Sequence, residues 1–215
     1  MVGAIAATAT VYLVMMLLGG ITPLRLILSG VVLSSAFSAV ASLLVFKAPD
    51  ARSAQSVLFW MLGSVSGAQW DRLLLPLLVL VLAVVLMFML SLRLDALSAG
   101  PETAAALGVR GGLLRKVLFA VQALLVGAMV AVAGGIGSVG LVIPHFARLV
   151  VGSVHRQVIP VAVFGGALFL LWVDVLARLI APPQEIPLGV VTGVIGAPVF
   201  LLLIGRSRYR FGGQS

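Results

Sequence analysis

The chain has 215 residues, of which 62% are hydrophobic and 9% are charged, and its mean hydropathy is +1.26. A soluble domain could not bury this much apolar surface, so the composition excludes a water-soluble protein and indicates a membrane protein. The net charge of +8 does not indicate nucleic-acid binding, because the few basic residues lie between apolar runs, where they orient a membrane protein. The lack of cysteine excludes disulfides, thiolate metal sites and cysteine nucleophiles.

Seven apolar runs are predicted to form transmembrane helices. Six have the length, about 17 to 25 residues, that crosses a bilayer. The first has no basic residue before its apolar core, which indicates a span rather than a secretory signal. The fifth is short and contains Pro144, His145 and Arg148, so its length also allows a re-entrant segment. The runs are 3–19, 26–46, 73–92, 113–133, 139–151, 158–180 and 188–204.

The basic residues decide whether the short run crosses. If it does, nine Lys and Arg lie on one side of the membrane and three on the other; if it does not, the division is five against seven. Since positive charge accumulates on the cytoplasmic side, we expect seven spans, with the first residue outside and the C-terminus inside. The inner residues are then Arg25, Arg93, Arg110, Arg115, Lys116, Arg156, Arg206, Arg208 and Arg210, and the outer ones are Lys47, Arg52 and Arg72.

The loops of the outer face are 48–55, an amphipathic link at 56–72 and 181–187. Trp60 and Trp70 in the link are typical of a membrane interface, where an indole is half wet. On the inner face, only the segment 93–116 is long enough to hold structure outside the lipid.

The inner segment contains residues that are typical of the start and the end of a short helix. Gly100 is a candidate N-cap, Pro101 suits the first helical position, Glu102 complements the positive end of the helix dipole, and Gly108 suits a left-handed C-terminal cap. These residues predict a helix of about two turns, preceded by a shorter turn over 94–99 with Asp95 near its start. So short a helix is marginal alone, so it should pack against its own bundle or against a partner.

Several motifs, in order along the whole chain, resemble the FecCD-type permease family, the membrane subunits of ABC importers for iron siderophores, haem and cobalamin. They are RLILSGVVLSSAFSA (25–39), LFWMLGSVSGAQW (58–70), LDALSAGPETAAALGV (94–109), GGIGSVGLVIPHFARLVVGSVHRQVIP (134–160) and VDVLARLIAPPQEIPLGVVTGVIGAPVFLLLI (173–204). The resemblance implies an all-α polytopic bundle of about ten helices with a cytoplasmic N-terminus. The seven spans match the last seven, so about three helices are expected ahead of Met1.

The resemblance also implies a role for the inner segment. Residues 94–109 match the family loop whose two short coupling helices dock in a cleft of the ATPase subunit, so 1–215 is expected to be one permease domain with a coupling loop at 93–112. The small face Ala104–Ala106 allows close packing, and Leu97 and Leu107 are the expected apolar anchors. The predicted contact residues are Leu97, Ala99, Gly100, Glu102, Thr103, Ala106, Leu107 and Gly108.

Two further sites follow from the resemblance, each with an ordinary alternative. Thr22 and Pro23 match the loop of the family's cytoplasmic gate, although a proline before a helix is also common in simple turns. Arg52 and Arg72 match positions where the family docks acidic residues of a periplasmic binding protein, although they could equally be solvated.

Asp174 and Arg178 are four residues apart, which predicts an ion pair on one face of a membrane helix. We interpret it as a structural pair that faces the bundle near the outer end, because a proton relay would need more than one such pair.

The two histidines and the glycines of 134–140 carry weaker signals. His145 and His155 lack the convergent partners of a metal site, so His145 is expected to be a hydrogen-bonded residue beside a proline. His155-Arg156 follows Val154, where relatives often carry an acid. Gly135, Gly137 and Gly140 spell GxGxxG without the strand of a nucleotide site, and we expect close helix packing and a bend there.

The expected function is that of a homodimeric permease in the bacterial inner membrane, with two ATPase subunits and a periplasmic binding protein, moving a bulky chelate inward by alternating access. ATP and Mg²⁺ would be bound by the partner, and this chain would bind no cofactor or metal and hold no catalytic residue. The alternative is an ion-coupled secondary transporter, for which only Asp174 and Arg178 are available. An intramembrane hydrolase is disfavoured, because Val65 stands where a GxSxG elbow needs serine.

Overall fold

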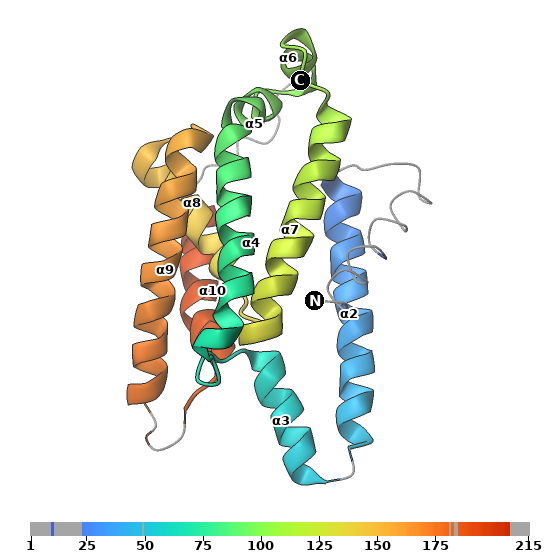
Figure 1. Ribbon diagram of the computed structural model, residues 1–215, viewed down its shortest axis with the longest axis vertical. Coiled ribbons are helices and arrows are strands. Elements are labelled where there is room, and N and C mark those ends of the chain that lie inside the picture. Colours follow the sequence, from blue (N-terminus) through green and yellow to red (C-terminus); the bar gives the residue numbers. More distant parts are fainter. Residues whose placement is uncertain (1–9, 11–22, 49, 181, 183–184, 207–215) are drawn as a thin grey trace.

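The computed structural model describes residues 10, 23–48, 50–180, 182 and 185–206, and within these ranges it is helical without strands. The predicted all-α class is confirmed. Figure 1 shows a bundle of roughly parallel long helices, with two short helices at one end. The helices are α2 (Pro23–Phe46), α3 (Ala51–Leu62), α4 (Trp70–Met89), α5 (Ser91–Ser98), α6 (Pro101–Ala106), α7 (Gly111–Ala133), α8 (Val139–Val151), α9 (His155–Leu179) and α10 (Leu188–Arg206).

Four helices have the length and apolar composition of a membrane span, and two more are apolar but shorter. They correspond to six of the seven predicted runs, with ends that differ by a few residues; the first predicted run, 3–19, lies outside the described residues. The four are Leu28–Phe46, Trp70–Met89, Gly111–Ala133 and His155–Leu179, and the shorter two are Val139–Val151 and Leu188–Val199.

The short helix α8 connects opposite ends of the bundle, which is the crossing that the charge count predicts. At its N-terminal side, the carbonyl of Ala133 accepts a hydrogen bond from the Ser64 amide (2.8 Å), which places the end of α7 beside α3. At its C-terminal side, His155 bonds to Asp95 on α5. A helix of 13 residues is only about 20 Å long, so its flanking loops complete the passage.

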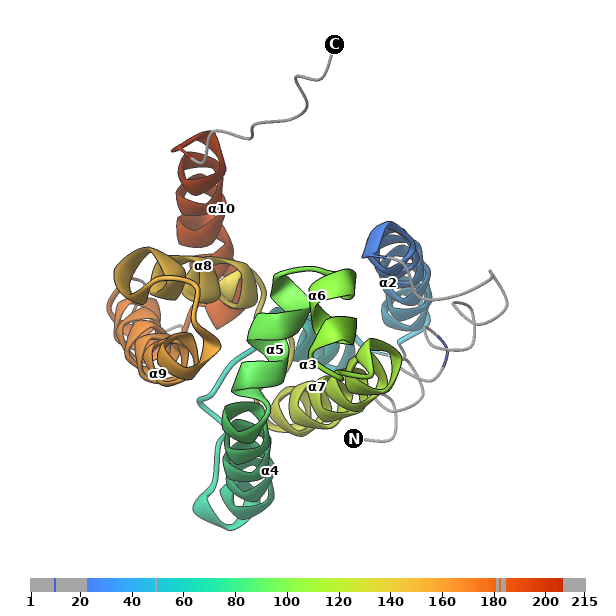
Figure 2. The same ribbon diagram turned by 90° about the horizontal axis from the view of Figure 1, so that it is seen from above.

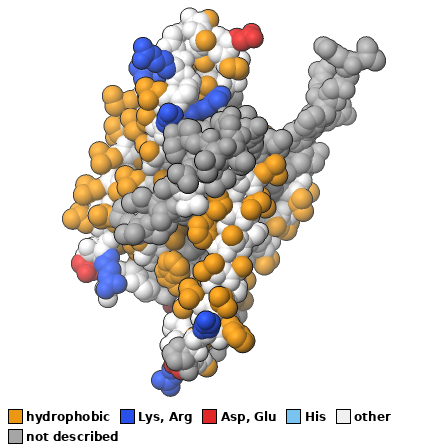
Figure 3. All heavy atoms as spheres, turned by 90° about the vertical axis from the view of Figure 1, so that its right-hand side faces the viewer, with side chains coloured by type: hydrophobic (Ala, Val, Ile, Leu, Met, Phe, Trp, Pro, Cys, Tyr) orange, Lys and Arg blue, Asp and Glu red, His pale blue; other side chains and the backbone are white. Residues whose placement is uncertain are grey.

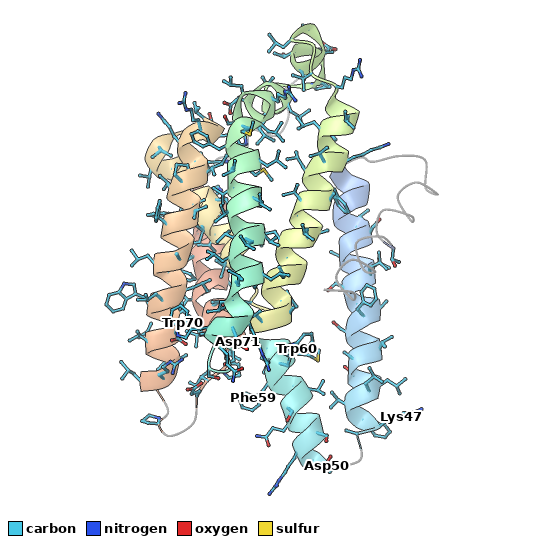
Figure 4. The ribbon with its side chains drawn as sticks, in the orientation of Figure 1. Lys47, Asp50, Phe59, Trp60, Trp70 and Asp71 are labelled. Atoms are coloured by element: carbon cyan, nitrogen blue, oxygen red, sulfur yellow. The ribbon has the colours of Figure 1, made fainter. Side chains whose placement is uncertain are left out.

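Part of the predicted outer loops is helical. Helix α3 covers the end of the loop 48–55 and the start of the link 56–72. Asp50 has extended backbone angles ahead of α3, and Gly63 at φ +75° ends it. None of the residues of α3 is buried. Trp60 and Trp70 are exposed and lie, with Lys47, Asp50 and Asp71, at the end opposite α5 and α6 (Figure 4), as expected for an interface.

Small residues dominate the contacts between helices. Ala104, Ala128 and Ala147 are each 1% exposed, while many Leu, Val and Phe side chains point outward. Figure 3 shows hydrophobic side chains over the flank of the molecule and charged ones toward its two ends. This distribution is that of a bundle surrounded by lipid, where small residues let backbones approach and large apolar residues face the hydrocarbon.

Glycines make one junction at the outer end unusually tight. A Cβ on Gly134 would lie 2.1 Å from the Trp60 carbonyl oxygen, and one on Gly189 would lie 2.3 Å from that of Leu62. The Leu188 amide donates to the Gly63 carbonyl (2.9 Å) at the same place. The end of α3 is thus held against the α7–α8 turn and the start of α10.

The glycine motif of 135–140 fits this junction only in part. A Cβ on Gly135 would lie 3.0 Å from the Met61 carbonyl oxygen, which agrees with the predicted close packing. Among the described residues, nothing lies within 4 Å of where a Cβ on Gly137 or Gly140 would be, so they do not show the predicted close packing there.

Candidate functional site: the short helix pair

Helix α6 has the predicted caps at both ends. Gly100 is its N-cap at φ +121°, Pro101 opens its first turn and Glu102 is the acid of that turn. Beyond its last residue, the Gly108 amide donates to the Ala105 carbonyl (3.0 Å) and the Val109 amide to the Ala104 carbonyl (2.8 Å). With Gly108 at φ +72°, this is a Schellman motif, which satisfies carbonyls that a helix end otherwise leaves free.

Helix α5 is longer than the sequence suggests. The predicted short turn over 94–99 is instead a helix from Ser91 to Ser98, longer than α6. It follows α4 after the single residue Leu90, whose carbonyl accepts from the Leu94 amide (2.9 Å). The prediction is too short because 73–92 reads as one apolar run that hides the change of direction at residue 90.

Residues 91–106, here called the α5–α6 segment, project from one end of the bundle (Figures 1 and 2). Helix α6 packs on α5 and α7 through Ala104, which is 1% exposed. The packing of this short helix on its own bundle, one of the two expected supports, is therefore present. The other residues of α6 are exposed.

The predicted contact residues divide into two groups. Leu107 is 66% exposed, and six others of the set lie at the surface or are partly exposed: Ala99, Gly100, Glu102, Thr103, Ala106 and Gly108. Leu97 is different, because it is half-buried and its Cδ1 lies 3.4 Å from where a Cβ on Gly111 would be. Leu97 thus packs against the start of α7, and Leu107 is the apolar side chain left at the surface.

A hydrogen-bonded pair that the sequence did not reveal attaches α5 to α9. Asp95 Oδ1 accepts from the His155 backbone amide (2.9 Å) and lies 2.6 Å from His155 Nδ1. Burial raises the pKa of Asp95, but the hydrogen bonds from the His155 backbone and ring and the imidazole charge lower it more, so its pKa lies below 3.8. The carboxylate is therefore ionised at neutral pH, and because it only accepts, Nδ1 carries the hydrogen.

Comparison with known proteins gives this arrangement a context. Residues 1–206 match the FecCD transport family. The chain belongs to that family. Among its relatives it is 40% identical over 187 residues to the probable siderophore transport system permease protein YfiZ of Bacillus subtilis, covering 87% of this chain and 56% of the relative. It is 37% identical to the Fe(3+)-citrate import system permease protein YfmD of the same bacterium, covering 96% and 61%.

A third relative, the hemin transport system permease protein HmuU of Yersinia pestis, is 38% identical over 86% of this chain and 55% of its own length. A solved structure of an inward-facing metal-chelate type ABC transporter is 37% identical, with a TM-score of 0.84 over 93% of this chain and 63% of the other. This FecCD chain thus spans between half and two thirds of the proteins it matches. It is a multi-pass membrane protein of a transport permease family.

Beside the α5–α6 segment, this FecCD chain has a groove of about 600 Å³ between α5 and the start of α7. Its wall is apolar apart from Arg93 and Arg110, both exposed. A third basic residue of this end, Arg156, lies with its guanidinium 5.6 Å from the ring centre of Phe88, a cation–π contact. Three of the nine basic residues predicted for the inner face thus lie at the end of the bundle that carries the α5–α6 segment.

The other candidate sites of the FecCD chain lie far from this segment or outside the described residues. Arg52 is exposed and borders a shallow hollow of about 460 Å³ with Gln55, Ser56 and Phe59, and Arg72 is exposed in the first turn of α4. Pro23 is the first residue of α2, whereas Thr22 lies outside the described residues.

Asp174 and Arg178 form two hydrogen bonds, from Nε to Oδ2 (2.9 Å) and from Nη2 to Oδ1 (3.3 Å). The guanidinium also donates to Glu185 Oε1 (3.3 Å), an acid in the following loop that the i,i+4 spacing could not reveal. The side chains are 30% and 46% exposed, so within this chain the pair lies at the surface rather than inside the bundle.

We expect Arg178→Ala to destabilise the chain more than Asp174→Asn does. The alanine leaves two carboxylates, Asp174 and Glu185, close together without a cation, whereas the asparagine leaves the contact between Arg178 and Glu185 intact. Thermal unfolding of both variants in the same detergent measures the order. Equal losses would show that Glu185 contributes nothing.

Within the described ranges, no group of three or more His, Cys, Asp or Glu lies close enough together to bind a metal ion. His145 is half-buried in α8 beside Pro144, which lies inside the helix. Its expected hydrogen bond is not found among the described residues. His155 is instead the partner of Asp95.

Proposed function

We propose that this chain is the membrane-spanning permease part of a bacterial ABC importer that moves a metal chelate inward by ATP-driven alternating access. The observation that carries the proposal is the match in sequence and fold to a metal-chelate type ABC transporter over 93% of the chain. The relatives are named as permeases for siderophores, iron citrate, hemin, cobalamin and molybdate, and among these we propose an iron–siderophore complex, iron citrate, haem or cobalamin as the cargo.

The α5–α6 segment, with residues 93–112 as the coupling loop, is the proposed contact for an ATPase subunit. The caps hold α6 in a fixed shape, and its exposed small residues are followed directly by Leu107, which is 66% exposed. Such a surface suits close insertion into a cleft, with Leu107 as the anchor. ATP and Mg²⁺ would bind to that partner, and this chain would supply neither catalytic residues nor a cofactor site.

The orientation follows from charge. With α5 and α6 in the cytoplasm, the ends of α7 and α9 that carry Arg110, Arg115 and Arg156 also lie there, in agreement with the positive-inside rule. In the bacterial inner membrane, the C-terminus is then on the cytoplasmic side, and α3 lies at the periplasmic end of the bundle. There Arg52 and Arg72 would meet acidic residues of a binding protein.

Transport would proceed by coupled rearrangement of two permease copies. When ATP draws the two ATPase subunits together, the α5–α6 segments move with them, and the path between the copies changes the side to which it opens. Thr22 and Pro23 would lie at the cytoplasmic gate of this path. The chain itself needs no ionisable group in the membrane for this mechanism.

Uptake assays test the proposal. The permease, co-expressed with its ATPase and binding protein, should import radioactive iron–siderophore, iron citrate, haem or cyanocobalamin, and an ATPase variant unable to hydrolyse ATP should abolish import. Uptake that persists without the ATPase and collapses with the proton gradient would instead establish the ion-coupled alternative.

A further inference from the structure

Helix α9 begins without a cap of its own. Its N-cap residue is Val154, whose side chain has no acceptor, and no side chain of the local sequence caps the helix. The amide of His155 is instead bonded to Asp95, 60 positions earlier in the chain. The carboxylate supplies an acceptor and a negative charge at the positive end of the helix dipole. Asp95 therefore acts as an N-terminal cap that belongs to another helix.

The same oxygen bonds the ring of this residue, so the connection has two parts. The imidazole Nδ1 lies 2.6 Å from Asp95 Oδ1, and the side chains of Asp95 and His155 are 30% and 17% exposed. Helix α5 packs on α9, and two residues of α5, Ser91 and Ala96, are buried, at 4% and 7% exposure. The contact is thus partly shielded from water, which strengthens its hydrogen bonds.

The pair lies where it connects the α5–α6 segment to a different part of the bundle. The α5–α6 segment is covalently continuous with α4 and α7, which pack on each other. Helix α9 packs mainly along α8 and less extensively on α4 and α5, and α10 contacts both α8 and α9. Asp95 therefore joins the segment to helices other than its covalent neighbours, at the first residue of α9.

We propose that Asp95 is a positioning residue for energy coupling, whose contact with His155 makes the start of α9 follow any displacement of the α5–α6 segment. This inference rests on the proposed function, in which the segment is moved by an ATPase. Without the contact, the start of α9 would be linked to the segment by helix packing alone, and α8 and α9 would lag behind.

The experiment measures the two movements separately. Because the chain has no cysteine, spin labels can be placed on Asp71→Cys as a reference at the outer start of α4, paired with Ser98→Cys on α5 or Ser153→Cys before α9. Electron–electron distance measurements on the complex of permease and ATPase then compare the nucleotide-free and ATP-bound states. Both distances should shift in the otherwise unchanged protein.

In the Asp95→Ala background, we expect the 71–98 shift to persist and the 71–153 shift to be lost. Asp50→Asn, which removes an exposed acid that makes no cap bond, is the control and should leave both shifts unchanged. A 71–153 shift of full size in Asp95→Ala would overturn the proposal. If neither distance shifts in the unsubstituted protein, the proposed ATP-driven function itself has failed.

Asp95→Asn guards against misfolding of the alanine variant. Its amide oxygen still accepts from the His155 backbone but has no charge, so the helix remains capped. We expect a 71–153 shift smaller than in the unsubstituted protein and larger than in Asp95→Ala. If Asp95→Ala does not assemble and Asp95→Asn shows a 71–153 shift of full size, the pair contributes to folding but not to coupling. That result would overturn the proposal.

Discussion

The double variant Gly100→Pro with Leu107→Asp should hydrolyse ATP yet import at least about tenfold less chelate per ATP, a coupling loss of about 1.4 kcal/mol. Gly100 holds φ at +121°, which proline cannot adopt because its ring fixes φ near −65°. Proline also removes the amide that donates to the Leu97 carbonyl (3.3 Å). The turn between α5 and α6 is thereby disrupted, and the aspartate places a charge where Leu107 would anchor the ATPase.

Leu179→Asp is the matched control for this prediction. Leu179 is the last residue of α9, at the end of the bundle opposite the α5–α6 segment, and its exposure is close to that of Leu107, 69% against 66%. We expect its uptake per ATP to stay near that of the unsubstituted protein. The amount of permease in the membrane must be measured for each variant. Undiminished uptake in the double variant would refute the coupling assignment.

The glycine junction should give the largest loss of stability from a single methyl group. In Gly134→Ala, the added Cβ would meet the Trp60 carbonyl oxygen at 2.1 Å, a backbone atom that cannot turn aside. The residue also has φ +71° and ψ −164°, a backbone conformation essentially restricted to glycine, which costs another residue about 1 to 3 kcal/mol. With the clash added, we expect a destabilisation of roughly 3 kcal/mol or more.

Gly152→Ala isolates the backbone term. Gly152 has φ +82°, but a Cβ there would have open space around it, so only the positive φ is penalised. Thermal unfolding or inactivation half-lives in detergent should show that Gly134→Ala is much less stable than Gly152→Ala. If the two variants lose the same stability, the tight contact between the end of α3 and the α7–α8 turn does not contribute.

The features that the sequence predicts well are local ones. Gly100, Pro101 and Gly108 each restrict the backbone at their own position, so the residue types alone are enough to place the caps of α6. The bounds of α8, 139–151, agree residue for residue, because Ser138 and Gly152 at its two ends have positive φ. Hydropathy and charge together are sufficient to expect it to connect the two ends of the bundle.

The features that the sequence does not reveal depend on distant parts of the chain. Asp95 and His155 are 60 residues apart, and no local pattern pairs them. The topology does place both on the inner side, and a helix start with valine at its cap position lacks an acceptor; these two signals together point toward such a partner. Similarly, two leucines of the inner segment read alike, but the approach of α7 buries Leu97 and leaves Leu107 outside.

The capped state of α6 bears on how a motor subunit would recognise it. A segment that folds only on binding gives up part of the interaction free energy to order itself, whereas a helix that is closed at both ends beforehand avoids most of that entropic loss. A helix of six residues with one buried alanine could therefore bind with a higher affinity than its small contact area suggests. Association should accordingly show a small heat-capacity change, in keeping with rigid docking rather than coupled folding.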